Sequence, residues 1–194
     1  MKYFKLLALI AFATSASASQ MTIQLDPNLG NVQFHASGHP SALKITGKGK
    51  APEGTFKGSL QGISGTATFD LTSLETGVSM RDHHMKEKYL ETGTFPKSEL
   101  TITQLKFPQP LQNGKAFSFD SLPFQGKLKL HGLEKPVTGT AHVESDGQTI
   151  LKVVAEFALK LNDYGVAVPS FAGITVADDV QVTVESTGKI SLNL

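Results

Sequence analysis

Apolar residues recur at every second position over most of this chain. The longest such row consists of Leu151, Val153, Ala155, Phe157, Leu159 and Leu161. Shorter rows of the same period occupy residues 32–36, 56–60, 124–130 and 180–184. A period of two is typical of β-strands that bury one face and expose the other to water. The pattern therefore predicts an all-β fold, either an antiparallel sandwich or a barrel.

Clusters of turn-forming residues separate the apolar rows. They are Asp26-Pro27-Asn28, Gln112-Asn113-Gly114 and Ser145-Asp146-Gly147. The first is predicted to lie between strands, and the other two are predicted to form hairpin turns. No linker, low-complexity tract or internal repeat interrupts the series, so we expect a single domain. Closure into a barrel would remove the exposed sheet edges.

Residues 81–91 break the alternation. Tyr89 and Leu90 follow Met85 by four and five positions, and charged residues lie between them. This spacing predicts one short helix near residues 82–91, with Asp82 as the capping residue at its start. Pro96 marks the return to extended chain.

Residues 1–18 have the composition of a secretory signal peptide. Lys2 and Lys5 precede an apolar run, and Ala16-Ser17-Ala18 supplies a cleavage site. The run is shorter than the ~20 residues that a membrane span needs, so no transmembrane segment is expected in the mature chain, residues 19–194. We expect a periplasmic protein, with secretion as the second choice.

Composition excludes several function classes. The chain has no cysteine, which excludes disulfides, thiolate metal sites and a cysteine nucleophile. The leader removes two of the 18 basic side chains, which leaves 16 against 17 acidic ones. This balance provides no electrostatic attraction for nucleic acid, so no nucleic-acid partner is expected.

Small residues occupy several positions in the rows that should face the interior. Ala36, Gly58, Gly126 and Ala155 are the clearest cases. In a solid core, large side chains opposite would fill the space that they leave. In a ligand-binding barrel the same residues would leave a tube. The pattern by itself leaves both interpretations open, because an eight-stranded barrel is wide enough for either.

Several short motifs follow one another between residues 32 and 180. They include Arg81-Asp82-x-x-Met85-x-x-x-Tyr89-Leu90 with Phe95-Pro96, then Gly126-Lys127-Leu128-x-Leu130-His131-Gly132, then Asn162-Asp163-Tyr164-Gly165-Val166. In this order and spacing they resemble the YceI-like family of bacterial periplasmic proteins. The resemblance implies an antiparallel, extended, lipocalin-like β-barrel of about eight strands, with an apolar cavity that binds isoprenoid lipids.

The chain departs from the family pattern at three places. One is Leu90-Glu91-Thr92, which stands where the family has a phenylalanine after the helix motif. Residues 26–31 read Asp-Pro-Asn-Leu-Gly-Asn where many members have Asp-x-x-His-Ser, and Lys160 and Asn162 stand where arginine is frequent. These departures concern the contacts to a lipid head group rather than the fold.

The resemblance implies a non-catalytic carrier with a polyprenyl phosphate or quinone bound in the barrel, and no other cofactor. It implies a cavity wall made by Phe34, Phe56, Phe69, Phe124, Leu128, Leu130, Phe157 and Leu159. It also provides three candidates for the rim and the head group, which are Arg81, His84 and His131. The apolar residues would serve equally as a packed core. Arg81 would equally form a capping ion pair with Asp82, and His131 would equally be a turn residue. A homodimer is a further option that the resemblance leaves open.

Two other functions fit parts of the sequence. One is an exported stress-protective or interaction protein with a filled core. The other is a hydrolase or metal protein that uses Asp82, His83 and His84. Adjacent histidines on a helix point in different directions, which disfavours a shared metal ion. Gly62-Ile63-Ser64-Gly65 is one residue too short for a nucleophile elbow. We therefore expect no metal site and no enzyme activity.

Overall fold

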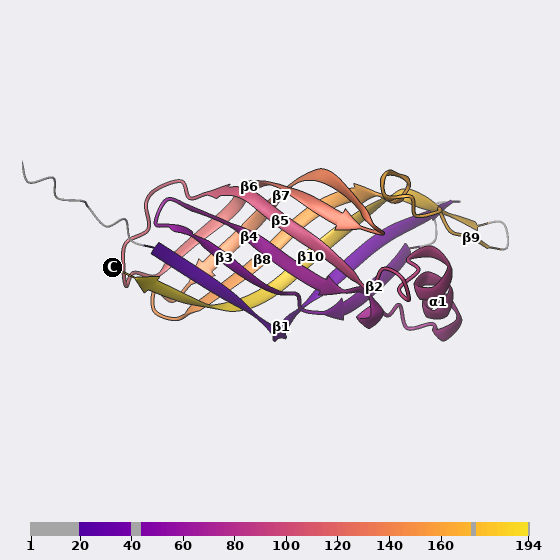
Figure 1. Ribbon diagram of the computed structural model, residues 1–194, viewed down its shortest axis with the longest axis horizontal. Helices are drawn as coiled ribbons and strands as arrows, with labels where there is room; N and C mark the ends of the chain where they lie inside the picture. The colour runs from indigo at the N-terminus through magenta and orange to yellow at the C-terminus, as the bar shows by residue number, and fades with distance from the viewer. Residues whose placement is uncertain (1–19, 40–43, 172–173, 194) are drawn as a thin grey trace, which may run out of the picture.

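The computed structural model describes residues 20–39, 44–171 and 174–193 (Figure 1). The predicted signal peptide, residues 1–18, lies outside them. The strands are β1 Gln20–His39, β2 Lys44–Lys50, β3 Glu53–Ser59, β4 Gly62–Asp70, β5 Lys97–Lys106, β6 Phe117–Leu130, β7 Leu133–Ser145, β8 Ile150–Lys160, β9 Ser170–Phe171 and β10 Ile174–Asn193. The helical segments are η1 Leu71–Ser73, α1 Ser79–His84, η2 Met85–Tyr89 and η3 Leu161–Tyr164.

The strands close into an antiparallel barrel. Each pairs with its neighbour in the order β1, β3, β4, β5, β6, β7, β8, β10, and β10 pairs back onto β1. β2 pairs with β1 beyond the stretch that pairs with β3, so β2 and β3 act as one interrupted strand. Within the described residues this gives eight strands and one short helix, which confirms the predicted fold class.

A bulge in β1 changes which residues face the interior. Before it, β1 buries Met21, Ile23 and Leu25, which are odd-numbered, and after it the buried positions are even-numbered, starting at Val32. The pairing with β10 shifts between Leu25 and Gly30. The prediction that Asp26-Pro27-Asn28 separates two strands was therefore wrong. The bulge inserts an odd number of extra residues into β1, so the apolar residues after it, which stand at even-numbered positions, face the interior. In a straight strand without the bulge they would face outward.

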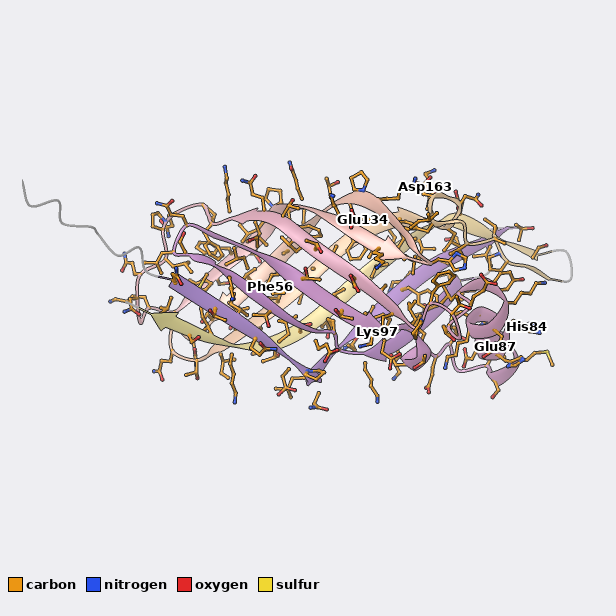
Figure 2. The ribbon with its side chains drawn as sticks, in the orientation of Figure 1. Phe56, His84, Glu87, Lys97, Glu134 and Asp163 are labelled. Carbon is orange, nitrogen blue, oxygen red and sulfur yellow. The ribbon has the colours of Figure 1, made fainter. Side chains whose placement is uncertain are left out.

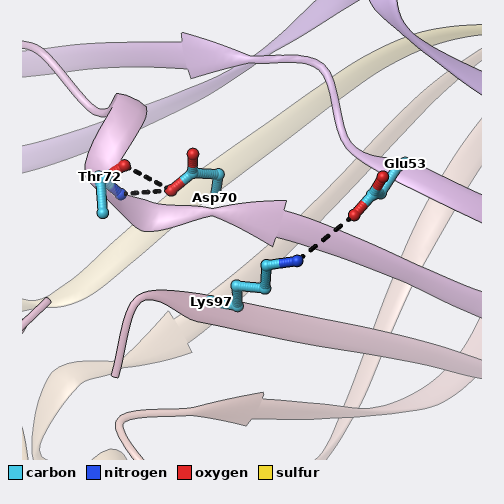
Figure 3. Close-up of polar contacts among 4 residues, drawn as sticks. All are labelled: Glu53, Asp70, Thr72 and Lys97. Carbon is cyan, nitrogen blue, oxygen red and sulfur yellow. Dashed lines mark hydrogen bonds and ion pairs between the residues drawn. The ribbon is translucent and has the colours of Figure 1, made fainter. Parts of the chain in front are cut away.

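The connection from β4 to β5 contains the helical segments η1, α1 and η2 and covers one end of the barrel (Figure 1). Its two ends are held side by side, since Leu71 N–H donates to the carbonyl of Pro96 at 2.9 Å. The Asp70 carboxylate accepts from the backbone N–H of Thr72 at 2.9 Å, and Lys97 pairs with Glu53 at 3.5 Å (Figure 3). The insertion is thus anchored where it leaves and rejoins the wall.

The helix differs in detail from the predicted one. It begins at Ser79, three residues before the predicted start, and its second half, η2, is a π-helical turn. Asp82 does not cap it, because Val78 occupies the N-cap position. The Asp82 carboxylate accepts instead from the backbone N–H of Thr76 at 2.7 Å. A polar loop before the helix therefore uses the carboxylate that the sequence assigned to the cap.

The predicted turn at Ser145-Asp146-Gly147 joins β7 to β8, with the Asp146 carboxylate accepting from three backbone N–H groups at 2.8–3.1 Å. The predicted turn at Gln112-Asn113-Gly114 is part of a longer connection, residues 107–116. Phenylalanine rings tie that connection to β6: Phe107 stacks on Phe119 with ring centroids 6.0 Å apart, and it meets Phe117 at a tilt with centroids 6.1 Å apart.

The barrel interior has two parts, which we call the filled half and the hollow half. The filled half lies at the end where β1 begins and β10 ends, and its most buried side chains are Met21, Ile23, Phe124, Val143 and Leu151. The hollow half is lined by residues of α1 and by residues next to β9, and Figure 1 shows both elements at the same end of the barrel.

Candidate functional site

A cavity of about 460 Å³ occupies the hollow half. Its wall comes from the inward rows of the strands, and its mouth is lined by Val78, Met80 and Arg81 at α1 and by Pro169 and Ser170 near β9. Most lining side chains are aliphatic or aromatic. A long apolar space with a few polar groups at one end is suited to an amphipathic ligand.

Three neighbouring strands build one side of the cavity in register. Phe34 on β1 is opposite Val182 on β10, and Val182 is opposite Phe157 on β8. Ala36 is likewise opposite Val180. All five side chains line the cavity. The alternation seen in the sequence thus produces a continuous apolar wall once the strands pair.

Six of the eight predicted cavity residues line this space. They are Phe34, Phe69, Leu128, Leu130, Phe157 and Leu159. The pattern identified the inward face of each strand, and for these six the position along the barrel axis also lies in the hollow half.

Phe56 and Phe124 do not line the cavity, which corrects their assignment. Phe124 is only 2% exposed and meets Phe157 edge-on, with ring centroids 6.3 Å apart. Phe56 packs against the core, with its ring over Gly65 of β4. Figure 2 places Phe56 toward the filled half, away from His84. Both residues face inward, but they lie too far from the mouth.

Sequence reasoning missed the part of the wall that the helical segments supply. Met80, Met85, Tyr89 and Leu90 line the cavity from α1, η2 and the residue after η2, and Leu161 does so from η3. The spacing of Met85, Tyr89 and Leu90 was the available signal, since an apolar helical face must be covered by something.

The inward glycines do not leave the space that the sequence suggested. A Cβ on Gly58 would lie 2.1 Å from the carbonyl oxygen of Gly62, and one on Gly126 would lie 2.5 Å from that of Thr101. These glycines permit close approach of neighbouring strands. Gly47 has another role, because a Cβ there would lie 2.2 Å from the ring of Phe34. Of the four small residues singled out, only Ala36 lines the cavity.

Polar groups at the mouth form a compact network around Thr76. The Arg81 guanidinium donates from Nε to Thr76 Oγ1 at 2.7 Å and from Nη2 to the Thr76 carbonyl at 2.9 Å. The Thr76 hydroxyl and backbone N–H both donate to the Asp82 carboxylate. Arg81 and Thr76 both line the cavity. The network therefore fixes a cationic group at the open end of an apolar space.

The two candidate rim histidines have different surroundings. His84 is exposed and lines the mouth, and its ring centroid lies 6.1 Å from that of His83. His131 does not line the cavity, so its assignment to the rim is corrected. Its Nε2 lies 2.7 Å from a carboxylate oxygen of Glu91, and its Nδ1 lies 3.2 Å from the carbonyl oxygen of Tyr164. It connects the end of the helical insertion to η3.

In the described ranges, no group of three histidine or acidic side chains is placed to hold a metal ion. The Asp82 carboxylate is directed at Thr76, which leaves it outside any cluster with His83 and His84. None of the helices in those ranges has both the length and the hydropathy of a membrane span.

Comparisons with known proteins agree with this architecture. The chain is 27% identical over 172 residues to the Protein YceI of Salmonella newport (strain SL254), with 84% of each chain covered. A solved polyisoprenoid binding domain from Saccharophagus degradans has a TM-score of 0.65 at 19% identity, covering 87% of this chain and 98% of that one. BcnA of Burkholderia cenocepacia has a TM-score of 0.61 at 16% identity, covering 86% and 99%.

At these identities the two solved structures show a shared fold. The family model for the YceI-like domain matches residues 23–187, which covers the barrel from early β1 to late β10. The matched region includes every residue that lines the cavity. The chain therefore belongs to the YceI-like domain family.

Proposed function

We propose that this protein is a non-catalytic periplasmic carrier that holds the tail of an isoprenoid-type lipid in the hollow half of its barrel. The observation that carries the proposal is the 460 Å³ apolar cavity with a single arginine at its mouth. Each CH₂ group moved from water into such a cavity contributes about 0.8 kcal/mol, so a long tail binds tightly without polar contacts. The polyisoprenoid-binding domain of Saccharophagus degradans, which has this fold, supports the choice of ligand class.

The mouth network supports a polar head group next to Arg81. Two bonds to Thr76 engage Nε and Nη2, among the five N–H donors of the guanidinium. A phosphate or quinone oxygen at the mouth would accept a charge-assisted hydrogen bond from this group. The head group would then remain at the opening while the tail lies along Phe34, Leu128 and Phe157.

The first test is native mass spectrometry of the mature protein purified from periplasm, followed by organic extraction. A discrete added mass that extracts as an isoprenoid supports the carrier. Two results together contradict it: the protein shows no added ligand mass, and its melting temperature does not rise with added polyprenyl lipid. Binding to the folded state must stabilise that state.

A variant pair separates a cavity from a solid core. Leu128→Asp places a carboxylate in the cavity wall, whereas Gln125→Asp places one on the exposed face of the same strand. We expect Leu128→Asp to remain folded and to lose the lipid, and Gln125→Asp to retain it. Unfolding of Leu128→Asp alone would favour an interaction protein with a filled core, because an unpaired charge is not tolerated in a packed interior.

A further inference from the structure

The cavity ends partway along the barrel, at a floor of buried side chains. On β5 the cavity is lined by Leu100, but not by Ile102, the next inward residue. On β10 it is lined by Val184, but not by Ser186, which is 5% exposed. On β6 the lining stops at Leu128, and the next large inward side chain is Phe124. On each of these three strands the lining thus ends at a buried side chain.

Phe124 does not itself line the cavity, but it is the largest of the side chains directly behind its end, and its position is set by two neighbours. It is opposite Gly139 on β7, and Gly139 is opposite Phe157 on β8. A Cβ on Gly139 would lie 2.6 Å from the Phe124 ring, so this glycine provides the space in which the ring lies. The ring planes of Phe124 and Phe157 meet at 80°. Two packed rings therefore cross three strands at the end of the cavity.

The size of the space above the floor limits the tail that it can hold. An engineered cavity of roughly 150 Å³ holds one benzene, so 460 Å³ corresponds to about 18 carbon atoms, or nearly four isoprene units. In the filled half, a second pocket beside Met21 and Ile190 measures about 20 Å³, which accommodates about one water molecule. A longer tail has no continuous path into the filled half.

We propose that the floor formed by Phe124 against Phe157 limits the enclosed tail to about four isoprene units, and that Phe124 sets this length. The proposal rests on the carrier function above and adds a chain-length specificity to it. Units beyond the fourth would remain outside the mouth and gain no burial. Lipids with a longer isoprenoid tail would therefore bind no more tightly than a lipid whose tail has four units.

The test uses the lipid-free mature chain and three alcohols with the same head group: geraniol, geranylgeraniol and octaprenol. Affinities come from titrations in a common non-denaturing detergent, and native mass spectrometry checks that the complexes contain one ligand. We expect geranylgeraniol to bind at least about tenfold more tightly than geraniol, since it buries two more units. We expect octaprenol to bind no more tightly than geranylgeraniol.

Three variants test whether Phe124 at the floor sets the limit on tail length. Phe124→Ala, and Phe124→Leu as the milder change, should raise the affinity ratio of octaprenol to geranylgeraniol, in the alanine variant by about tenfold. Phe119→Leu is the matched control, because it shortens a phenylalanine of the same strand near the Phe107 stack, away from the floor. It should leave the ratio unchanged.

The outcomes separate this proposal from the carrier function. If none of the three alcohols binds, the carrier function fails. If octaprenol binds the unmodified protein at least tenfold more tightly than geranylgeraniol, the carrier remains and the length limit is overturned. An unchanged ratio in both Phe124 variants overturns the role of that residue. The series on the unmodified protein decides the length limit even if the alanine variant does not fold.

Discussion

The two halves of this barrel are made by the same strands with the same alternation, yet one is packed and the other encloses a cavity. The filled half contains a pocket of about 20 Å³, against about 460 Å³ in the hollow half. On β10, Ile190 and Leu192 pack in the core of the filled half, whereas Val180, Val182 and Val184 line the cavity. The backbone of this strand continues from one half to the other, so the side chains that meet across the interior decide which half is filled.

A cavity in a closed barrel therefore depends on the side chains of all its strands together, because a protein interior is otherwise packed to high density. Rings in both halves lie over glycines of a neighbouring strand, as Phe56 does over Gly65 in the filled half. Phe34 lies over Gly47, and Phe69 lies over Gly49, because neither glycine has a side chain to hold the ring away from the sheet.

The largest expected effect comes from the same substitution made in each half. Val143→Asp in the filled half replaces a side chain that is 1% exposed, and we expect it to cost more than about 4 kcal/mol and to unfold the barrel. Val182→Asp faces the cavity and should cost no more than about 3 kcal/mol. Urea unfolding followed by circular dichroism measures both, with Gln181→Asp on the exposed face of β10 as control. Equal costs for the two valine variants would mean that the halves do not differ in packing.

A smaller effect is expected when one aromatic ring is removed from each half. Phe124→Ala should lower the free energy of unfolding by about 3–5 kcal/mol, because a packed site cannot close around the lost ring. Phe34→Ala should lower it by only about 1–2 kcal/mol, since one side of that ring already borders the cavity. Thermal and urea unfolding of the two variants measure the difference. A cost at Phe34 that matched the one at Phe124 would argue against an open cavity beside Phe34.

The mouth of the hollow half depends on polar contacts that have no counterpart in a packed core. Thr76→Val removes the hydroxyl that accepts from Arg81 and donates to Asp82, and we expect a local cost of about 1–2 kcal/mol. Hydrogen exchange should accelerate in α1 and η2 while the strands remain protected. Thr138→Val, on the outer face of β7, is the control. Uniform loss of protection through all strands would show that the network stabilises the whole barrel rather than its mouth.

The smallest expected effect is a difference in pH sensitivity between the ends. At the β7–β8 turn, hydrogen bonds from the backbone of Gln148 and its neighbours lower the pKa of Asp146 from 3.8. This contribution to stability is present above about pH 3.8 and is lost as pH falls through the lowered pKa. Beside the hollow half, burial and then the charge of Asp163 raise the pKa of Tyr164 above 10.0. That contribution is complete below about pH 10 and is lost as pH rises through the raised pKa.

Local hydrogen exchange or melting temperature as a function of pH tests this difference. Asp146→Asn should remove the acid-sensitive component, and Tyr164→Phe should remove the alkaline one. If Tyr164→Phe changes stability at acid pH, or if Asp146→Asn changes stability at alkaline pH, then the assignment of each pH dependence to one end of the barrel is incorrect.

The sequence predicted the inward face of each strand correctly at most positions, but not the position of each residue along the barrel axis. Phe124 and Leu128 belong to one row, and the alternation makes them equivalent. Only the pairing of β6 with its neighbours places Leu128 in the cavity wall and Phe124 in the floor. The bulge in β1 was missed for a related reason. A run of Asp, Pro and Asn is equally compatible with a turn and with an irregular stretch inside a long strand.

Two things follow from the sequence by itself: an all-β antiparallel barrel, and membership of the YceI-like family. Alternation and turn chemistry are local properties, and motif order can be recognised without coordinates. The location of the cavity, its floor and the roles of His131 and Asp82 were decided by the tertiary structure. An internal volume is what remains after side chains from all eight strands and the helical insertion have filled the barrel, so it depends on residues far apart in the sequence.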